Sequence, residues 1–253
     1  MASDKIALSV CAHPDDAEFF CAGTLALLRQ KDWQIHIATM TPGDCGTVEY
    51  SREEISQIRK GEAARAAAVL NGQYHCLECD DVFIMYDRPA LMKVIKLIRE
   101  IQPSLVLTQC PEDYMVDHTA TGRLAMTGCF CCGLPNIHIE GVDTFEPVPH
   151  LYYMDPAEGK DNFGEVIKPQ WVIDISNAFD TKLEMLSCHE SQRNWLMTHH
   201  GMDEYTEMMK HSSAERGKLI GANYGEGFRQ HLGHAFPQDN LLKAELDDLV
   251  HEL

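Results

Sequence analysis

The fold is decided by a stretch near the N-terminus, residues 6–30, which reads IALSVCAHPDDAEFFCAGTLALLRQ. Ile6 to Ala12 is a short apolar run that ends at a proline turn, which is typical of a buried strand. Glu18 to Gln30 follows, with apolar residues at helical spacing. A strand followed directly by a helix predicts the first βα unit of an α/β protein.

The same alternation continues along the chain. It predicts strands at 33–40, 74–77 and 104–108, and helices at 53–70 and 89–101. Beyond them it predicts strands at 151–154 and 171–175 and helices at 178–197, 203–220 and 244–252. Four βα units in a row predict a Rossmann-like α/β fold with a mostly parallel sheet covered by helices on both faces. We expect one domain over 1–253, with 150–253 a C-terminal portion that packs over the active-site end.

Composition excludes several classes of protein. With 21 basic and 39 acidic residues the net charge is −18, and no local basic patch interrupts it, so we expect no nucleic-acid partner. The longest uncharged stretch, Leu124 to Ile139, is broken by glycines and a proline, and we expect no membrane span. No basic region precedes the first apolar run, as a secretory signal would require. Ten cysteines, many in apolar segments, predict free thiols and a cytoplasmic location.

The sharpest motif is His13-Pro14-Asp15-Asp16, placed where the first strand ends and the first helix begins. Ligands bind at the carboxyl ends of strands in open α/β sheets. Imidazole and carboxylate are ligands that zinc accepts, and Asp15 could act on water beside the metal. The alternative is that the two carboxylates merely complement a helix N-terminus while His13 bonds to backbone. The position after the first strand favours the metal site.

A metal site needs a third protein ligand, and the loop after the fourth strand offers one. His118 opens a helix there, directly after Asp117. Asp117 could hold that imidazole in the tautomer that offers a nitrogen to zinc. Two cysteine groups, at 76–79 and 129–132, give only a weak structural zinc signal. The first strand is followed by none of the glycine-rich nucleotide-binding loops.

These motifs resemble the LmbE-like, or PIG-L, family of zinc-dependent de-N-acetylases, whose fold is a three-layer sandwich. The segment 12–18, Ala-His-Pro-Asp-Asp-Ala-Glu, matches the family signature. The resemblance covers roughly residues 5–230 and includes the following further positions: Thr41, Gly43, Arg59, Glu62, Asp113, Tyr114, Asp117, His118, the segment 172–176, Lys182, His189, Ser191 and Gln192.

The resemblance implies roles for individual residues. His13, Asp16 and His118 would bind one zinc ion per chain, and Asp15 would be the general base. Arg59 and Glu62 would lie near the pocket, with Arg59 holding a substrate oxygen; the alternative is an ordinary ion pair on a helix face. Arg59 and Asp117 are counted with Asp15 as catalytic candidates. The substrate-binding candidates are Glu62, Tyr114, Met115 and His200.

One position departs from the family pattern. Many members carry His-Pro before the Asp-His pair, and that His is thought to stabilise an oxyanion or protonate the leaving amine. This chain has Met115 and Val116 there. Either His189, His199 or His200 substitutes, or catalysis is slow, or the protein is a binding relative.

The sequence therefore predicts a hydrolase that uses a zinc-activated water to remove the N-acetyl group from an amino sugar or its conjugate. The alternative is a weakly active or non-catalytic relative that binds a sugar or a metal. The resemblance also suggests a homo-oligomer, a trimer or hexamer. Nothing in the sequence names the sugar.

Overall fold

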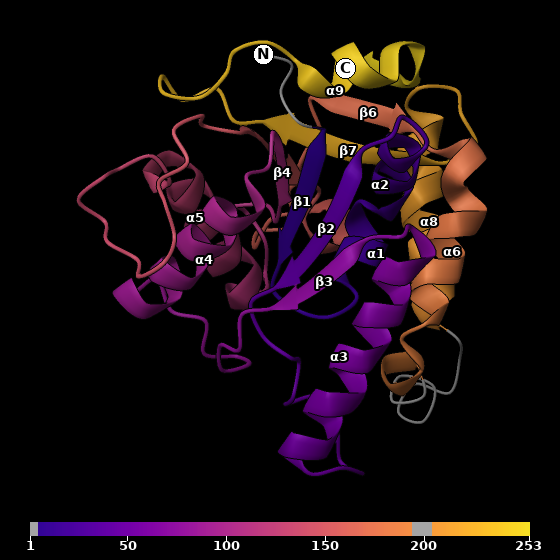
Figure 1. Ribbon diagram of the computed structural model, residues 1–253. Coiled ribbons are helices and arrows are strands. Elements are labelled where there is room, and N and C mark those ends of the chain that lie inside the picture. The colour runs from indigo at the N-terminus through magenta and orange to yellow at the C-terminus, as the bar shows by residue number, and fades with distance from the viewer. Residues whose placement is uncertain (1–4, 194–203) are drawn as a thin grey trace.

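In the computed structural model, which describes residues 5–193 and 204–253, eight strands form one sheet in the order β3-β2-β1-β4-β5-β7-β6-β8 (Figure 1). The first five along the chain are β1 (Ile6–Cys11), β2 (Gln34–Thr39), β3 (Gln73–Cys76), β4 (Leu105–Thr108) and β5 (His150–Met154). These five pair in parallel. The others, β6 (Trp171–Asp174), β7 (Gly225–Gln230) and β8 (Val250–Glu252), pair antiparallel. The predicted α/β class with a mostly parallel sheet is confirmed.

Helices cover both faces of this sheet, as Figure 1 shows. On one side lie α4 (Arg88–Ile101) and α5 (Val116–Cys131). On the other lie α1 (Asp16–Phe20), α2 (Ala22–Arg29), α3 (Arg52–Val69), α6 (Phe179–Ser187) and α8 (Glu204–Lys218). Short helices complete the described chain: η1 (Ala157–Gly159), η2 (Ser176–Ala178), α9 (Leu241–Leu246) and η3 (Asp247–Leu249). Each face has its own apolar core, which produces the three layers.

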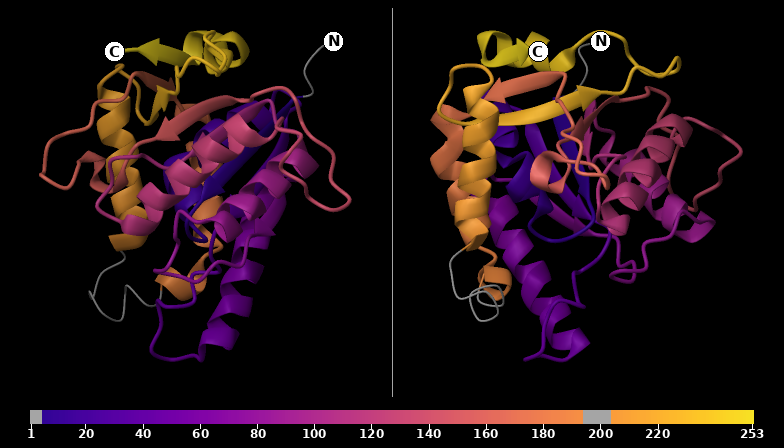
Figure 2. Two further views of the ribbon diagram at one scale, coloured as in Figure 1. Left: turned by 90° about the vertical axis from the view of Figure 1, so that its left-hand side faces the viewer. Right: turned by 180° about the vertical axis from the view of Figure 1, so that it is seen from behind.

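The order of the strands in the sheet determines where a ligand site is expected. The chain runs from β1 to β2 and β3 on one side, and then crosses to β4 on the other side of β1. In such sheets the crevice at this switch point, outside the carboxyl ends of the strands, binds ligands. β1 starts at the end of the molecule where the C-terminus lies (Figures 1 and 2). The carboxyl ends of β1 and β4 therefore face the opposite end.

The predicted helix 18–30 is two helices, and a buried carboxylate explains the break. Glu226 accepts hydrogen bonds from the backbone N–H groups of Gly23 (2.9 Å) and Thr24 (2.8 Å), which begin α2. Lys182 Nζ lies 2.6 Å from the same carboxylate and donates to the carbonyl of Phe19 at 2.7 Å. Capping by a distant side chain starts a new helix where local spacing predicts a continuous one.

The C-terminal region differs more from the prediction. The predicted helix 244–252 is wrong: α9 ends at Leu246, Asp247 has a positive φ of 48°, and β8 then pairs with β6. The predicted helix 178–197 is interrupted after Ser187, and its last residues lie outside the described part of the chain. β7 was not predicted because its sequence, GEGFRQ, lacks an alternating apolar pattern.

The side chain of Lys182 gives a first testable prediction. Lys182 and Glu226 are almost fully buried, so replacing Lys182 with Met would leave a buried carboxylate without its charge partner. We expect Lys182→Met to lower the free energy of unfolding by about 3–5 kcal/mol in urea titration. Lys218→Met, which breaks an exposed pair with Glu215, is the matched control and should cost about 1 kcal/mol or less. Equal losses in both variants would contradict a structural role for Lys182.

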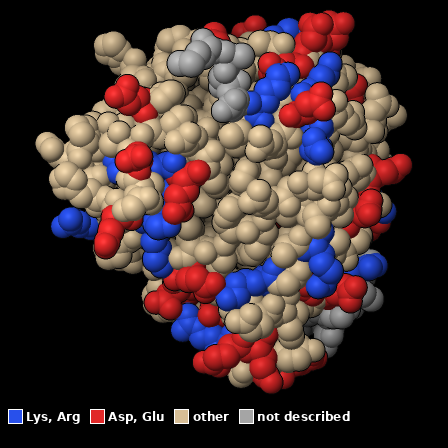
Figure 3. All heavy atoms as spheres, viewed as in Figure 1, with Lys and Arg blue, Asp and Glu red and all other residues tan. Residues whose placement is uncertain are grey.

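Charge is mixed over the surface. On the face shown in Figure 3, Asp and Glu side chains lie in several separate groups, interspersed with Lys and Arg. The acidic excess is therefore not gathered into one patch on this face. All ten cysteines are free thiols. No helix in the described residues is long and apolar enough to cross a membrane.

Candidate active site

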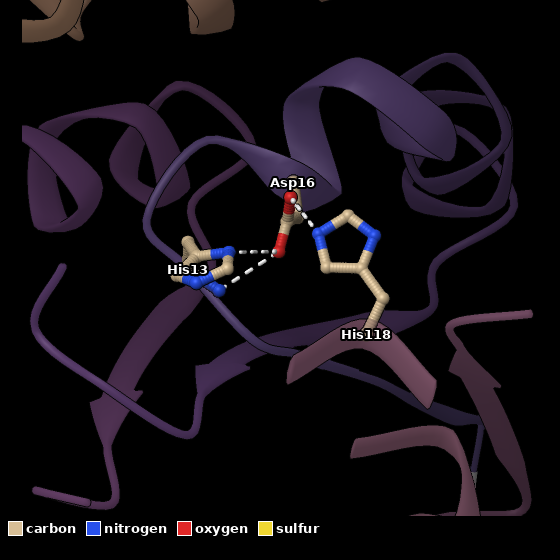
Figure 4. A group of neighbouring side chains, drawn as sticks. All are labelled: His13, Asp16 and His118. Carbon is tan, nitrogen blue, oxygen red and sulfur yellow. Dashed lines mark hydrogen bonds and ion pairs between the residues drawn. The ribbon is translucent and has the colours of Figure 1, made fainter. Parts of the chain in front are cut away.

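Three predicted ligands converge at the switch point between β1 and β4. His13 follows β1, Asp16 begins α1, and His118 lies in the first turn of α5. Figure 4 shows the carboxylate of Asp16 between the two imidazoles. Its Oδ2 lies 3.5 Å from His13 Nδ1, and its Oδ1 lies 3.3 Å from His118 Nε2. One ligand atom from each residue falls within 4.8 Å of the others, which suits a single metal ion.

The carboxylate of Asp16 is held so that one oxygen, Oδ1, faces His118. Its Oδ2 accepts from the backbone N–H of His13 and from Gln109 Nε2, each at 2.8 Å. Gln109 is itself fixed, because its Oε1 accepts from the backbone N–H of Ala12 at 2.8 Å. Oδ1 is thereby left directed at His118, as a metal ligand would require.

His118 has the surroundings of a metal ligand. It is fully buried, and its Nδ1 lies 3.0 Å from Asp113 Oδ2. Its Nε2 makes no hydrogen bond of acceptable geometry with any described residue. Burial opposes protonation, but Asp16 and Asp113 outweigh it and raise the pKa of His118 to about 9. A buried imidazole nitrogen without a donor or acceptor, facing a carboxylate, fits a zinc ion.

Asp113, rather than Asp117, orients His118. The structure instead places Asp117 Oδ2 at 3.3 Å from His13 Nε2. That oxygen also accepts from the backbone N–H of Val82 at 2.8 Å. Adjacent residues of a helix point in different directions, so Asp117 turns away from its neighbour and toward the other imidazole.

A second carboxylate faces His13. Asp81 Oδ1 lies 3.3 Å from His13 Nε2, while its Oδ2 accepts from the backbone N–H of Cys45 at 2.9 Å. Asp81 belongs to two further groups that could hold a cation, one with His13 and Asp117 and the other with Asp44 and Cys45. Because backbone donors already engage Asp81 and Asp117, they serve best as partners that orient the His13 ring.

Asp15 lies beside the three candidate ligands, His13, Asp16 and His118, but is not one of them. As the residue before α1 it has a φ of 106°, which is strained for a residue other than glycine. Its Oδ2 accepts from Tyr205 OH at 2.7 Å and lies 3.3 Å from Arg59 Nη2. No described residue donates to its Oδ1. Burial raises the pKa of Asp15 despite the opposing charge of Arg59.

Arg59 is locked against the backbone of the site. Its guanidinium donates to the carbonyls of Gly43 and Pro14, each at 2.8 Å. Gly43 has a φ of 69°, and a Cβ there would lie 2.4 Å from Arg59 Nη1, so only glycine fits. Arg59 therefore holds the Pro14–Asp15 turn in place. Its guanidinium contacts do not include the ion pair with Glu62 that the alternative interpretation predicts.

The remaining candidates are placed as follows. Tyr114 and Met115 line a cleft of about 920 Å³ that is also lined by His13, Asp15 and Asp16. Glu62 accepts from Ser191 N at 2.8 Å and Ser191 Oγ at 2.6 Å, and it is not among the cleft-lining residues. His189 is buried with its Nε2 3.4 Å from Glu18. His199 and His200 lie outside the described residues.

Tyr205 is the main residue that sequence reasoning missed. It is nearly buried, and its ring packs against Phe19 at a centroid distance of 5.9 Å. It lies in α8, 190 positions from its partner Asp15, and a lone tyrosine on a helix carries no signal. Asp81 was missed too, although the pair Asp80-Asp81, three residues after the predicted strand 74–77, resembles the pattern at Asp15 and Asp16.

Removal of the Tyr205 hydroxyl tests whether it positions Asp15. Tyr205→Phe keeps the packing on Phe19 but deletes the donor to Oδ2, so we expect kcat to fall about 10-fold with KM and metal content unchanged. Tyr152→Phe is the matched control, since it removes a buried hydroxyl bonded to Asn240 at 2.9 Å, far from the cleft. It should lower the melting temperature and leave kcat within twofold. A KM effect without a kcat effect for Tyr205→Phe would contradict this role.

The fold and the site together define a Rossmann-like α/β enzyme with a candidate metal centre at the carboxyl ends of its strands. The family model for PIG-L, GlcNAc-PI de-N-acetylase, matches residues 8–129. A probable N-acetyl-alpha-D-glucosaminyl L-malate deacetylase 2 of Bacillus cereus is 30% identical over 203 residues, covering 75% of this chain and 84% of that one. The chain belongs to the PIG-L family, as its sequence motifs predict.

Other relatives extend this similarity. Diacetylchitobiose deacetylase of Thermococcus kodakarensis is 28% identical over 235 residues, covering 89% of this chain and 82% of its own. The structure of N,N'-diacetylchitobiose deacetylase from Pyrococcus horikoshii superposes with a TM-score of 0.78 at 25% identity, covering 94% and 88%. A 4-oxalmesaconate hydratase of Pseudomonas putida is 23% identical over 201 residues, covering 75% of each chain. The predicted deacetylase class is confirmed by the deacetylase relatives, while the hydratase is a relative with a different named activity.

Proposed function

We propose that this chain is a zinc-dependent N-deacetylase that removes the acetyl group from an N-acetylated amino sugar or its conjugate. The observation that carries the proposal is the convergence of His13, Asp16 and His118 beside an Asp15 carboxylate whose Oδ1 has no donor among the described residues. The named activities of the deacetylase relatives support it.

His13, Asp16 and His118 would hold the ion, with Asp117 and Asp81 orienting one imidazole and Asp113 the other. A zinc ion at this site would polarise the amide carbonyl and make water a better nucleophile near neutral pH. Asp15 lines the cleft, and its Oδ1 has no donor among the described residues, so it takes the proton of the attacking water. Tyr205 and Arg59 keep the other oxygen engaged and the carboxylate in one orientation.

The leaving amine also needs a proton, and Met115 cannot supply one. Asp15 has just accepted a proton and lies in the same cleft, so one carboxylate serves as base for water and then as acid for nitrogen. His189 is a poor substitute, because it is buried against Glu18 and is not among the cleft-lining residues. Roles for Glu62, Tyr114 and His200 in substrate binding stay predictions.

The test is direct measurement of acetate, since a relative with hydratase activity makes family membership alone insufficient. The purified protein is given N-acetylglucosamine, diacetylchitobiose and N-acetylglucosaminyl malate, with and without a chelator. We expect acetate and free amine in equal amounts from at least one substrate, lost with chelator and restored by zinc. No acetate from any N-acetyl sugar would favour the alternative, a non-catalytic sugar- or metal-binding relative.

Two further proposals concern the protein in the cell. Ten free cysteines, five of them buried, support a reducing, cytoplasmic compartment. We also propose a homo-oligomer, a trimer or hexamer, which light scattering of the purified protein would test.

A further inference from the structure

The cleft is larger than one sugar needs. About 920 Å³ lies near the upper end of the range for small-molecule sites. Two of the candidate ligands, His13 and Asp16, line the cleft, and we call the part beside the buried Asp16 its floor. The amide that reacts must reach this floor, so the rest of any substrate extends toward the open mouth.

Exposed apolar side chains gather at that mouth. We call Val82, Tyr114, Val166 and Met208 the apolar rim; they come from four separate segments and line the same cleft. They are 62%, 55%, 59% and 51% exposed, respectively. Soluble proteins rarely leave several large apolar side chains exposed in one place unless a ligand or partner covers them.

Two further apolar side chains, Phe20 and Met115, line the same cleft. Phe20 lies on the inner wall, with its ring edge-on to His118 at a centroid distance of 6.1 Å. Met115 lines the cleft next to Tyr114. Apolar side chains thus line the cleft both beside the candidate metal site and at the rim.

We propose that the apolar rim binds an alkyl or aryl aglycone carried by the amino sugar, at the end away from the acetamide. This rests on the proposed function, and it makes the substrate an amphiphilic N-acetyl glycoside. The rim lies at the mouth and the reacting amide at the floor, so the apolar group belongs to the aglycone rather than to the acyl chain. Burial of such a chain tightens binding because it removes apolar surface from water.

The test measures binding apart from hydrolysis. Metal-loaded Asp15→Asn protein is titrated calorimetrically with methyl and octyl N-acetyl-β-D-glucosaminide, diacetylchitobiose and N-octanoylglucosamine. We expect the octyl glycoside to bind at least about 10-fold more tightly than the methyl glycoside, because part of the chain is buried on the rim. Octyl and methyl affinities within twofold of each other would overturn the proposal. So would tighter binding of diacetylchitobiose or of N-octanoylglucosamine than of the octyl glycoside.

Variants of the apolar rim test whether its residues cause the preference for the octyl glycoside. Val166→Ser and Met208→Ser, made together, change exposed side chains and should reduce the octyl-to-methyl affinity ratio at least threefold. Leu219→Ser is the matched control, since Leu219 is 49% exposed and is not among the cleft-lining residues; its ratio should match the parent. An unchanged ratio in the rim variant would overturn the assignment to these residues.

The two proposals fail separately. An octyl preference in Asp15→Asn, with no acetate released by the wild type, would remove the deacetylase function and keep the apolar subsite. Acetate release without an octyl preference would keep the function and remove the subsite.

Discussion

Asp15→Asn is expected to lower kcat about 10²- to 10⁴-fold, the range typical of losing a positioned proton carrier. Asn keeps the size of the side chain and tolerates a positive φ better than most residues, so the turn at 106° should survive. It cannot accept the proton from water or return it to the amine. Steady-state kinetics together with zinc content by mass spectrometry measure both consequences.

The matched control is Asp16→Asn. Asp15 lies outside the groups that could hold a metal among the described residues, whereas Asp16 lies between the two imidazoles. Zinc should therefore remain at about one ion per chain in Asp15→Asn and be lost from Asp16→Asn. Metal loss from Asp15→Asn, with retention in Asp16→Asn, would show that the two carboxylates have exchanged roles.

The first half of the fold was predictable because each element has a local cause. Apolar runs of strand length end at prolines or glycines, and the four βα units leave little choice but a parallel sheet. The second half was harder. β7 carries Gly225 and Gly227, whose small size serves neighbours far away: a Cβ on Gly227 would lie 2.2 Å from Asp155. Between them, Glu226 caps α2. Such packing leaves no periodic signal in the sequence.

In the candidate site, too, some residues could be predicted from local motifs and others could not. His13, Asp15, Asp16 and His118 stand in motifs tied to strand ends, and topology alone brings the ends of β1 and β4 together. Their supporting partners were assigned less well. Asp117 faces His13 and Asp113 faces His118, because the direction of a side chain depends on the exact helix phase. Tyr205 reaches Asp15 from α8, a tertiary contact that no local pattern records.

His118→Gln is expected to abolish zinc binding and to lower activity about 10³-fold or more. Zinc contributes several kcal/mol to transition-state stabilisation in such sites, and each 1.36 kcal/mol is a factor of ten in rate. Gln fills much of the same buried space and can still contact Asp113, so the fold should persist without metal. The wild-type melting temperature should rise on adding zinc, since an ion that binds only the folded state stabilises it.

The zinc-dependent rise in melting temperature distinguishes loss of the ion from damage to the fold. In His118→Gln the zinc-dependent rise should disappear, while the melting temperature without metal stays close to that of the metal-free wild type. His138→Gln removes an exposed imidazole and should retain the full rise. If His118→Gln kept one zinc per chain and its thermal shift, the ion would bind elsewhere. The neighbouring group of His13, Asp81 and Asp117, which needs no nitrogen from α5, would then be the next candidate.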